Sequence, residues 1–260
     1  MLPDVATTYA SSTLVVFVYM LTVFAIAIVR RDNSIVDVAW GPGFALIAAT
    51  TFLLHSVSHS RMVLLVVLVA LWGTRLAAHI FFRNKGKGED FRYAAWRRSW
   101  GRMFYVRSFF FIYMLQGFLM LIIGYPIVLV GSIDQPALNF VDWIGAGVWF
   151  LGFGFEADGD YQLLLFKKNE ANRGKVLRSG LWKYTRHPNY FGEAVLWWGL
   201  FLIASSSPHG WTAIISPLVI TFLLLRISGV TMLEKKYSDN PEYEEYKRTT
   251  NAFFPWFPRR

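Results

Sequence analysis

Long runs of apolar residues, separated by short polar or basic connections, dominate the pattern of this chain. A helix needs about 20 consecutive, mostly apolar residues to cross a bilayer, and most of these runs approach that length. The pattern predicts seven membrane-spanning helices, at about residues 12–29, 35–54, 62–82, 109–130, 140–155, 190–204 and 211–225. The last three runs are the shortest, so their ends are the least well defined.

The basic residues fall in alternate connections, and this predicts the direction in which the chain crosses the membrane. Of its 26 Lys and Arg residues, 24 lie in the first, third and fifth connections and in the C-terminal tail. Positive charge gathers in the cytoplasmic loops of multi-pass proteins. Seven helices, with the N-terminus outside and the C-terminus cytoplasmic, satisfy this rule. We therefore expect residues 1–260 to form one all-α integral membrane domain, multi-pass and of a bacterial inner membrane.

Composition narrows the possible partners and chemistry. The chain is 55% hydrophobic and 17% charged, carries a net charge of +9 and has no cysteine. Disulfides, thiolate nucleophiles and Cys-ligated metals are excluded. Topology and anionic lipid account for the basic charge better than nucleic acid does, because no nucleic-acid recognition module is visible. We expect membrane lipid and a lipophilic small molecule as partners, no nucleic acid, and a monomer.

The segment from Gly180 to Glu193, GLWKYTRHPNYFGE, is the richest in candidate chemistry. Pro188 suits the first turn of a helix, and free N–H groups at a helix start favour an anion. Donors that could hold a phosphate or carboxylate surround that start: Tyr184, Arg186, His187, Asn189 and Tyr190. A capped membrane helix with interfacial aromatic residues would show the same pattern. Glu193, one turn inside the apolar run, needs a partner or a ligand.

Three further groups of polar residues are candidates. Glu156, Asp158 and Asp160 precede Lys167 and Lys168; without paired histidines this pattern predicts no metal site and is also typical of a solvated helix end. The third connection could form a phosphate cradle or simply be a positive cytoplasmic loop, and its polar residues are Asn84, Lys85, Lys87 and Arg92. Asp37 and Arg75, inside apolar runs, could be functional or could pair with each other.

From the second apolar run to the C-terminus, the chain resembles the membrane steroid 5α-reductases, and most closely the small bacterial members grouped as a domain of unknown function. The resemblance lies in the Asn84–Lys87 loop, the Glu156/Asp160/Lys167 spacing, the LWKYTRHPNYFGE block and the PEYEEYKRTTNAFFPWFP tail.

This resemblance implies a seven-helix enzyme that binds NADPH on its cytoplasmic side and transfers hydride to the C=C bond of a lipophilic enone, such as a 3-oxo-Δ4 steroid. It places the cofactor mainly in residues 84–260 and the substrate against the first four helices. Carried over by position, the cofactor contacts are Asn84, Lys87, Asp160, Lys167, Lys175, Asn189, Glu193, Trp197 and Arg226. Lys87, Lys167 and Lys175 stand where the animal enzymes have arginine.

The resemblance also implies a catalytic carboxyl at Asp37, which would have to be protonated to donate to the substrate carbonyl. Val36 and Gly73 stand where the family has a glutamine and its catalytic tyrosine. Another residue must then complete the electrophile, and Tyr93 and Arg75 are the candidates.

A second family shares part of this pattern. The RHPNY block followed by Glu193 also resembles the isoprenylcysteine carboxyl methyltransferases, which bind S-adenosylmethionine. The lysines at positions 87, 167 and 175 favour NADPH, because its 2′-phosphate requires nearby cations. Small residues let membrane helices approach closely, and the glycines expected at helix contacts are Gly41, Gly43, Gly117, Gly124, Gly145, Gly147 and Gly199.

Overall fold

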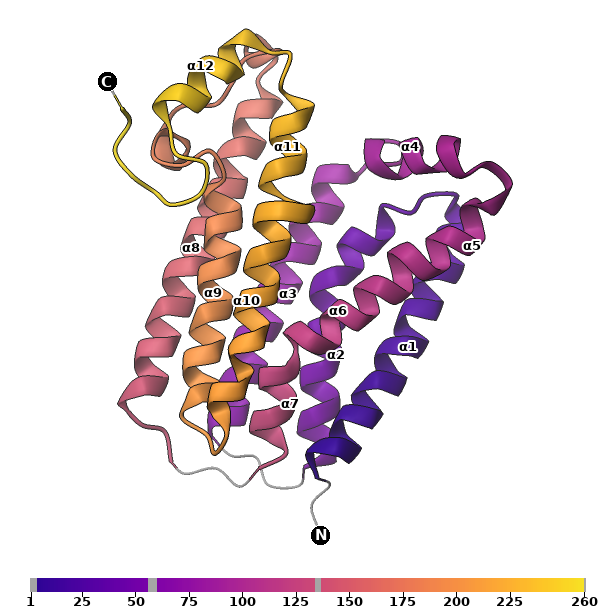
Figure 1. Ribbon diagram of the computed structural model, residues 1–260, viewed down its shortest axis with the longest axis vertical. Helices are drawn as coiled ribbons and strands as arrows, with labels where there is room; N and C mark the ends of the chain where they lie inside the picture. The colour runs from indigo at the N-terminus through magenta and orange to yellow at the C-terminus, as the bar shows by residue number, and fades with distance from the viewer. Residues whose placement is uncertain (1–3, 56–59, 134–136, 260) are drawn as a thin grey trace. The chain divides into compact units, whose positions relative to one another are not determined.

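A computed structural model describes residues 4–55, 60–133 and 137–259, apart from the side chain of Lys236. All regular structure within these residues is helical (Figure 1). The chain divides into two compact units, residues 1–139 with 204–213, and residues 140–203 with 214–260. The all-α class predicted from the apolar runs is confirmed.

Three long helices and a series of shorter ones build the first unit. The long helices are α1 (Val5–Arg30), α2 (Ile35–Leu54) and α3 (Ser60–Asn84). The shorter elements are α4 (Phe91–Trp100), η1 (Gly101–Met103), α5 (Phe104–Ser108), the π-helical turn η2 (Phe109–Met114), α6 (Leu115–Ile123), α7 (Tyr125–Gly131) and η5 (Gly210–Ile214), whose last residue falls in the second unit. Asp4 caps α1, because its side chain accepts a hydrogen bond from the Thr7 backbone N–H at 2.7 Å.

Helices α2 and α3 touch backbone to backbone. A Cβ atom added at Gly41 would lie 2.7 Å from the Cα of Gly73, and one added at Gly73 would lie 2.6 Å from the Gly41 carbonyl oxygen. Gly73 therefore allows close helix packing at the position where the resemblance implies a catalytic tyrosine.

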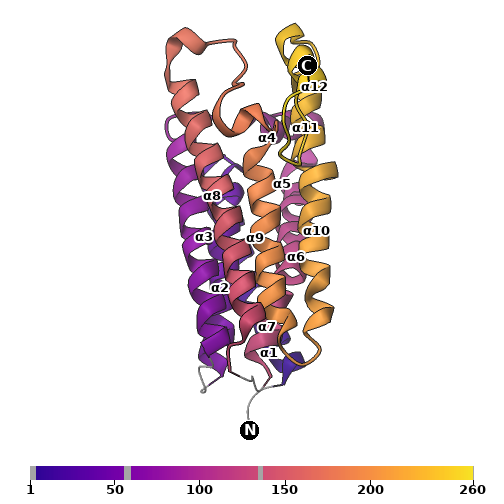
Figure 2. The same cartoon turned by 90° about the vertical axis from the view of Figure 1, so that its left-hand side faces the viewer.

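The second unit consists of two long helices, a shorter third and the C-terminal helices. They are α8 (Phe140–Lys168), α9 (Pro188–Ser205), α10 (Ile215–Phe222), the π-helical turn η6 (Leu223–Ile227), α11 (Val230–Lys236) and α12 (Pro241–Thr249). Two short 3₁₀ turns, η3 (Glu170–Asn172) and η4 (Gly180–Lys183), lie between α8 and α9. Figure 2 shows α8, α9 and α10 running side by side.

Glycines seven residues apart bring α8 and α9 together. A Cβ atom at Gly152 would lie 2.6 Å from the Gly192 carbonyl oxygen, and one at Gly145 would lie 2.8 Å from the Gly199 carbonyl oxygen. Both neighbours are backbone atoms, so no side chain can rotate away to make room. Six of the seven glycines expected at helix contacts have neighbours within 4 Å of an added Cβ, and at Gly43 and Gly117 these neighbours are side-chain atoms. Gly147 is the exception, because a Cβ there meets no described atom within 4 Å, and that prediction was wrong.

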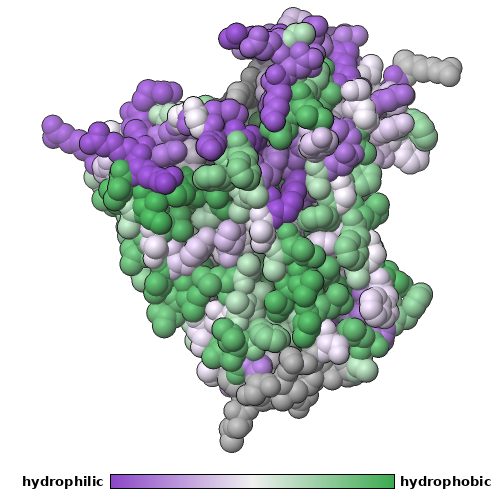
Figure 3. Space-filling model, turned by 180° about the vertical axis from the view of Figure 1, so that it is seen from behind, coloured by the Kyte–Doolittle hydropathy of each residue, from purple (hydrophilic) through white to green (hydrophobic). Residues whose placement is uncertain are grey.

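Five segments of the described chain are long and apolar enough to cross a membrane: Val5–Arg30, Ile35–Leu54, Ser60–Asn84, Phe91–Ile123 and Gly210–Lys235. They support a multi-pass membrane protein, whereas seven crossings and the orientation of the termini stay predictions. The fourth segment begins earlier than expected, because the helical path already starts in the basic connection. On the face drawn in Figure 3, hydrophobic side chains cover most of the helix bodies and hydrophilic ones gather toward helix ends.

Candidate functional site

A cavity of about 590 Å³ opens in the second unit, between the end of α8, the connection that follows it, and helices α11 and α12. Its volume falls within the range of small-molecule and cofactor pockets. Four of the predicted cofactor residues line this cavity, namely Lys167, Lys175, Arg186 and His187. These four residues share the cavity with residues 233–246 of the C-terminal helices, which supports a binding role for this part of the chain.

The cavity is rich in cations. Lys167, Arg173 and Lys175 contribute exposed basic side chains, and Glu170 is the carboxylate among the lining residues. Within the described chain, no carboxylate pairs with the side chains of Arg173 or Lys175. Cations without a protein counter-ion at the edge of a cavity favour an anionic ligand, and a phosphate is well suited to them.

Aromatic side chains of the C-terminal helices form the other wall. Tyr237, Tyr243 and Tyr246 line the cavity together with Trp182, and the rings of Tyr237 and Tyr243 lie 5.2 Å apart. Asn240 caps α12 by accepting hydrogen bonds from the backbone N–H groups of Glu242 and Tyr243, which fixes the start of that helix. Burial raises the pKa of both Tyr243 and Tyr246, so these phenols stay neutral. Flat neutral rings suit a heteroaromatic group of a ligand.

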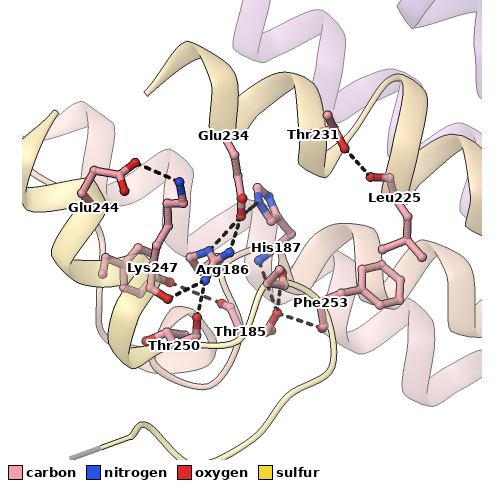
Figure 4. Close-up of polar contacts among 12 residues, drawn as sticks. Thr185, Arg186, His187, Leu225, Thr231, Glu234, Glu244, Lys247, Thr250 and Phe253 are labelled. Atoms are coloured by element: carbon pink, nitrogen blue, oxygen red, sulfur yellow. Dashed lines mark hydrogen bonds and ion pairs between the residues drawn. The ribbon is translucent and has the colours of Figure 1, made fainter. Parts of the chain in front are cut away.

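Arg186 links the cavity wall to helix α11 and to the end of helix α12 (Figure 4). Its Nε and Nη2 atoms donate to Glu234 Oε1 at 2.9 and 2.5 Å, and its Nη1 donates to the backbone carbonyl oxygens of Lys247 and Thr250. These contacts occupy four of the five N–H groups of the guanidinium. The geometry therefore gives Arg186 mainly a structural task, with little donor capacity left for a ligand.

His187 lies beside the same carboxylate. Its Nε2 is 3.5 Å from Glu234 Oε1 (Figure 4), and its ring stacks on Tyr190 with centroids 5.5 Å apart. Burial lowers the pKa of the His187 imidazole, and the attraction of Glu234 does not reverse that shift. His187 is therefore neutral near pH 7.

The predicted pair of Asp160 and Asn189 is in direct contact. The Asn189 side-chain amide donates to Asp160 Oδ1 at 3.0 Å, which links α8 to the first turn of α9. The other end of the amide, Oδ1 of Asn189, is buried without a hydrogen-bond partner among the described residues. A buried acceptor of this kind is costly unless a ligand or water donates to it. This acceptor is consistent with a ligand donor at this position.

A second polar cluster lies in the first unit, around Asp37. The Tyr93 hydroxyl donates to Asp37 Oδ1 at 2.6 Å, and Arg92 Nη2 lies 2.5 Å from Asp37 Oδ2. Both carboxyl oxygens of Asp37 thus accept hydrogen bonds, one from a phenol and one from a guanidinium. The Tyr93 hydroxyl proton is directed at Asp37 in this cluster.

The loop before α4 holds this cluster in place. Glu89 accepts hydrogen bonds from Arg97 and, at 2.9 Å, from the Asn33 backbone N–H. The Asp90 backbone N–H donates to the Ser34 hydroxyl at 2.7 Å. Burial raises the pKa of the Glu89 carboxyl, but its hydrogen bonds outweigh this effect and keep the pKa below its usual range. The start of α2 and the start of α4 are thereby locked together.

The other predicted site residues are spread over both units. In the first unit, Arg75 and Asn84 are half-buried on α3 and Lys87 is exposed. In the second unit, Trp197 is fully buried, Arg226 is exposed in η6, and Tyr184, Tyr190 and Glu193 flank the start of α9. None of these eight residues is among those that line the cavity.

Sequence reasoning missed several members of both clusters. Arg92, assigned to a phosphate cradle, is the partner of Asp37, and Glu234 had no assigned role although it anchors Arg186. Arg173 and the three tyrosines were also missed. The spacing of Tyr243 and Tyr246, three residues apart in PEYEEYKRTT, was a usable signal, because it places both rings on one face of a helix.

The helices and these polar clusters define a multi-pass, all-helical membrane protein, and comparisons identify its relatives. The family model described as "Protein of unknown function (DUF1295)" matches residues 23–250. Uncharacterized protein C594.04c of Schizosaccharomyces pombe is 25% identical over 92% of this chain and 77% of its own length. The 3-oxo-5-alpha-steroid 4-dehydrogenases 1 of Bos taurus and Mus musculus are 28% and 29% identical, each over 48% of both chains. No solved structure matches the chain.

The chain belongs to the DUF1295 family, because the family model spans most of its length. The distant similarity to the two steroid dehydrogenases confirms the predicted likeness to steroid 5α-reductases and indicates a reductase-like protein. The match covers about half of each mammalian enzyme.

Proposed function

We propose that this protein is an NADPH-dependent membrane reductase that adds hydride to the C=C bond of a lipophilic enone, with a 3-oxo-Δ4 steroid as the model substrate. The observation that carries the proposal is the cavity of the second unit, in which Arg173 and Lys175, paired with no carboxylate of the described residues, face a wall of aromatic rings. The similarity to 3-oxo-5-alpha-steroid 4-dehydrogenases supports the reaction class.

The residues of the cavity fit a phosphorylated dinucleotide. Lys167, Arg173 and Lys175 would hold phosphate groups, and Tyr237 and Tyr243 would pack against a ring of the nucleotide. When bound, NADPH would supply the hydride. The protein's own contribution in this unit is to orient the cofactor and to neutralise its charge.

The cluster of the first unit would polarise the substrate carbonyl. Hydride addition to the β-carbon of an enone places negative charge on the carbonyl oxygen, and a positioned donor stabilises that charge. The Tyr93 hydroxyl is the donor we assign. It donates to Asp37 in the structure, and it would turn its proton to the carbonyl oxygen when the substrate binds, while Arg92 stays paired with Asp37. A proton from water then reaches the α-carbon and completes the reduction. Tyr93 thereby takes the role that Gly73 cannot fill.

The experiment compares ligands for their effect on thermal unfolding of the detergent-purified protein. A ligand that binds only the folded state stabilises it by about 2.7 kcal/mol at a hundredfold excess over Kd. We expect stabilisation by NADPH, a weaker effect of NADH and none by S-adenosylmethionine. Stabilisation by S-adenosylmethionine alone would replace the reductase with the methyl-transfer alternative, to which the relatives give no support.

A charge variant ties that result to the cavity. Lys175→Gln removes one cation from the cavity, whereas Lys168→Gln removes an exposed cation of the same segment that does not line it. A charge-assisted phosphate contact is worth about 1.5 kcal/mol or more, so Lys175→Gln should weaken NADPH roughly tenfold. NADH should be affected less if Lys175 meets the 2′-phosphate. Equal NADPH affinities for the two variants would contradict the assigned site.

A further inference from the structure

Residues 253–257 are fixed in place but present large aromatic rings outward. We call residues 253–257 the aromatic tail. Three of its rings are largely exposed, Phe254 at 70%, Trp256 at 68% and Phe257 at 74%, whereas Phe253 is 7% exposed.

Backbone hydrogen bonds hold the aromatic tail at defined points. The Trp256 N–H donates to the Tyr184 carbonyl oxygen at 2.9 Å, and the Thr185 hydroxyl donates to the Phe253 carbonyl oxygen at 2.8 Å. Beyond the tail, the Arg259 N–H donates to the Thr249 carbonyl oxygen at 2.8 Å. Figure 4 shows Phe253 beside Thr185 in this arrangement. The exposed rings therefore sit on an ordered backbone rather than on a frayed end.

Basic side chains stand next to these rings. Lys183 lies over the ring of Tyr184, 5.8 Å from its centroid, and Tyr184 in turn packs edge-on against Phe257 at 5.9 Å. Lys183 and Arg259 are both exposed. Aromatic rings with neighbouring cations are typical of the level at which a membrane protein meets lipid headgroups.

We propose that the aromatic tail is a membrane-interface anchor whose partner is the headgroup region of an anionic bilayer. The rings of Phe254, Trp256 and Phe257 lie at the boundary of headgroups and acyl chains, and Lys183 and Arg259 meet lipid phosphates. A second copy of the chain fits this surface poorly, because a symmetric contact would bring these cations against one another. The proposal does not depend on the reductase activity.

The anchor has a consequence for the cavity. The tail is tied to Tyr184 and Thr185, which immediately precede Arg186 and His187 in the cavity wall. Contact with the bilayer would therefore hold this wall in position, and the protein should be more stable in anionic membranes than in neutral ones.

The test measures the depth of single spin labels in nanodiscs. Because the chain has no cysteine, Phe257→Cys gives a unique labelling site. Arg248→Cys, exposed on α12, is the water-facing control, and Phe150→Cys, 58% exposed on α8, is the lipid-facing control. Collisions of each label with oxygen, which concentrates in lipid, and with a water-soluble nickel chelate report its surroundings.

We expect the label at position 257 to collide more with oxygen and less with the nickel chelate than the label at position 248, with values nearer those of position 150. Phosphatidylglycerol should increase this difference over phosphatidylcholine alone, and Lys183→Gln with Arg259→Gln should remove the increase. Accessibility equal to that of position 248 would overturn the proposal. Low accessibility to both reagents, with spin–spin broadening, would show a second copy on this surface and would overturn it too.

Discussion

The contact between α8 and α9 offers a test that requires no knowledge of the substrate. Gly152→Ala places a methyl group 2.6 Å from the Gly192 carbonyl oxygen and still closer to the Leu196 backbone nitrogen. Neither backbone can rotate out of the way, so the two helices must separate. Gly147→Ala and Gly154→Ala on the same helix are matched controls, because a Cβ at either meets no described atom within 4 Å.

Two effects of opposite sign contribute to the change in stability of Gly152→Ala. Replacing a glycine inside a helix by alanine favours the helix by up to about 1 kcal/mol, and this is the whole effect expected for the two controls. Overpacking costs about 1–3 kcal/mol, and the rigid neighbours of Gly152 place it toward the upper end. Gly152→Ala should thus be about 1–2 kcal/mol less stable than the parent, and about 2–3 kcal/mol less stable than the controls.

The assay is thermal unfolding in one detergent, with the fraction of folded protein read by size-exclusion chromatography after heating. A difference of about 2–3 kcal/mol corresponds to a separation of several degrees for a chain of this size. Gly152→Ala should also weaken binding of NADPH, because the same two helices carry Asp160 and Asn189. If Gly152→Ala unfolds at the temperature of Gly147→Ala, the close packing of α8 and α9 is refuted.

Three further predictions concern the polar clusters. Tyr93→Phe should lower kcat with a 3-oxo-Δ4 steroid by about 10²–10⁴-fold, the usual contribution of a positioned acid, and leave the Kd of NADPH unchanged; full activity would exclude Tyr93 as the donor. Burial lowers the pKa of His187, so below about pH 6.5 the unfolded chain binds more protons than the folded one, and the melting temperature should fall as the pH is lowered. His187→Gln should flatten this pH dependence of the melting temperature. An unchanged slope would assign the pH dependence to other groups. Arg186→Gln removes the arginine partner of Glu234 and should cost about 2–4 kcal/mol of stability. Arg178→Gln, whose ion pairs are more exposed, should cost about 1 kcal/mol or less. Equal melting temperatures would contradict this assignment.

Local sequence patterns predicted the long apolar helices. The second predicted span coincides with α2 at Ile35–Leu54, because an apolar run in lipid must satisfy its backbone hydrogen bonds internally and a helix does so. The fifth predicted span, 140–155, forms the first part of α8, which continues to Lys168. Its acidic residues ended the apolar pattern without ending the helix, because Glu and Asp can remain helical where they find partners or solvent.

Candidate site residues were only partly predictable. Lys167, Lys175, Arg186 and His187 were identified from motifs that are contiguous or nearly so, and they line one cavity. Arg186 was given a ligand role, yet most of its donors face Glu234 and the chain's own carbonyl groups. A motif identifies a residue as a candidate, but only its contacts in the fold show whether it can bind a ligand or holds the protein together.

By itself, the sequence determined an all-helical, multi-pass membrane protein of this family, because hydrophobic length and motif content are local properties of the chain. The tertiary structure decided which charges meet. The Asp37 carboxyl group lies against Arg92 and Tyr93, more than fifty residues away along the chain. Glu234 on α11 lies against Arg186 in the connection before α9. Such pairings depend on the angles and registers of packed helices, which arise from the sum of many weak side-chain contacts and leave no mark in any short stretch of sequence.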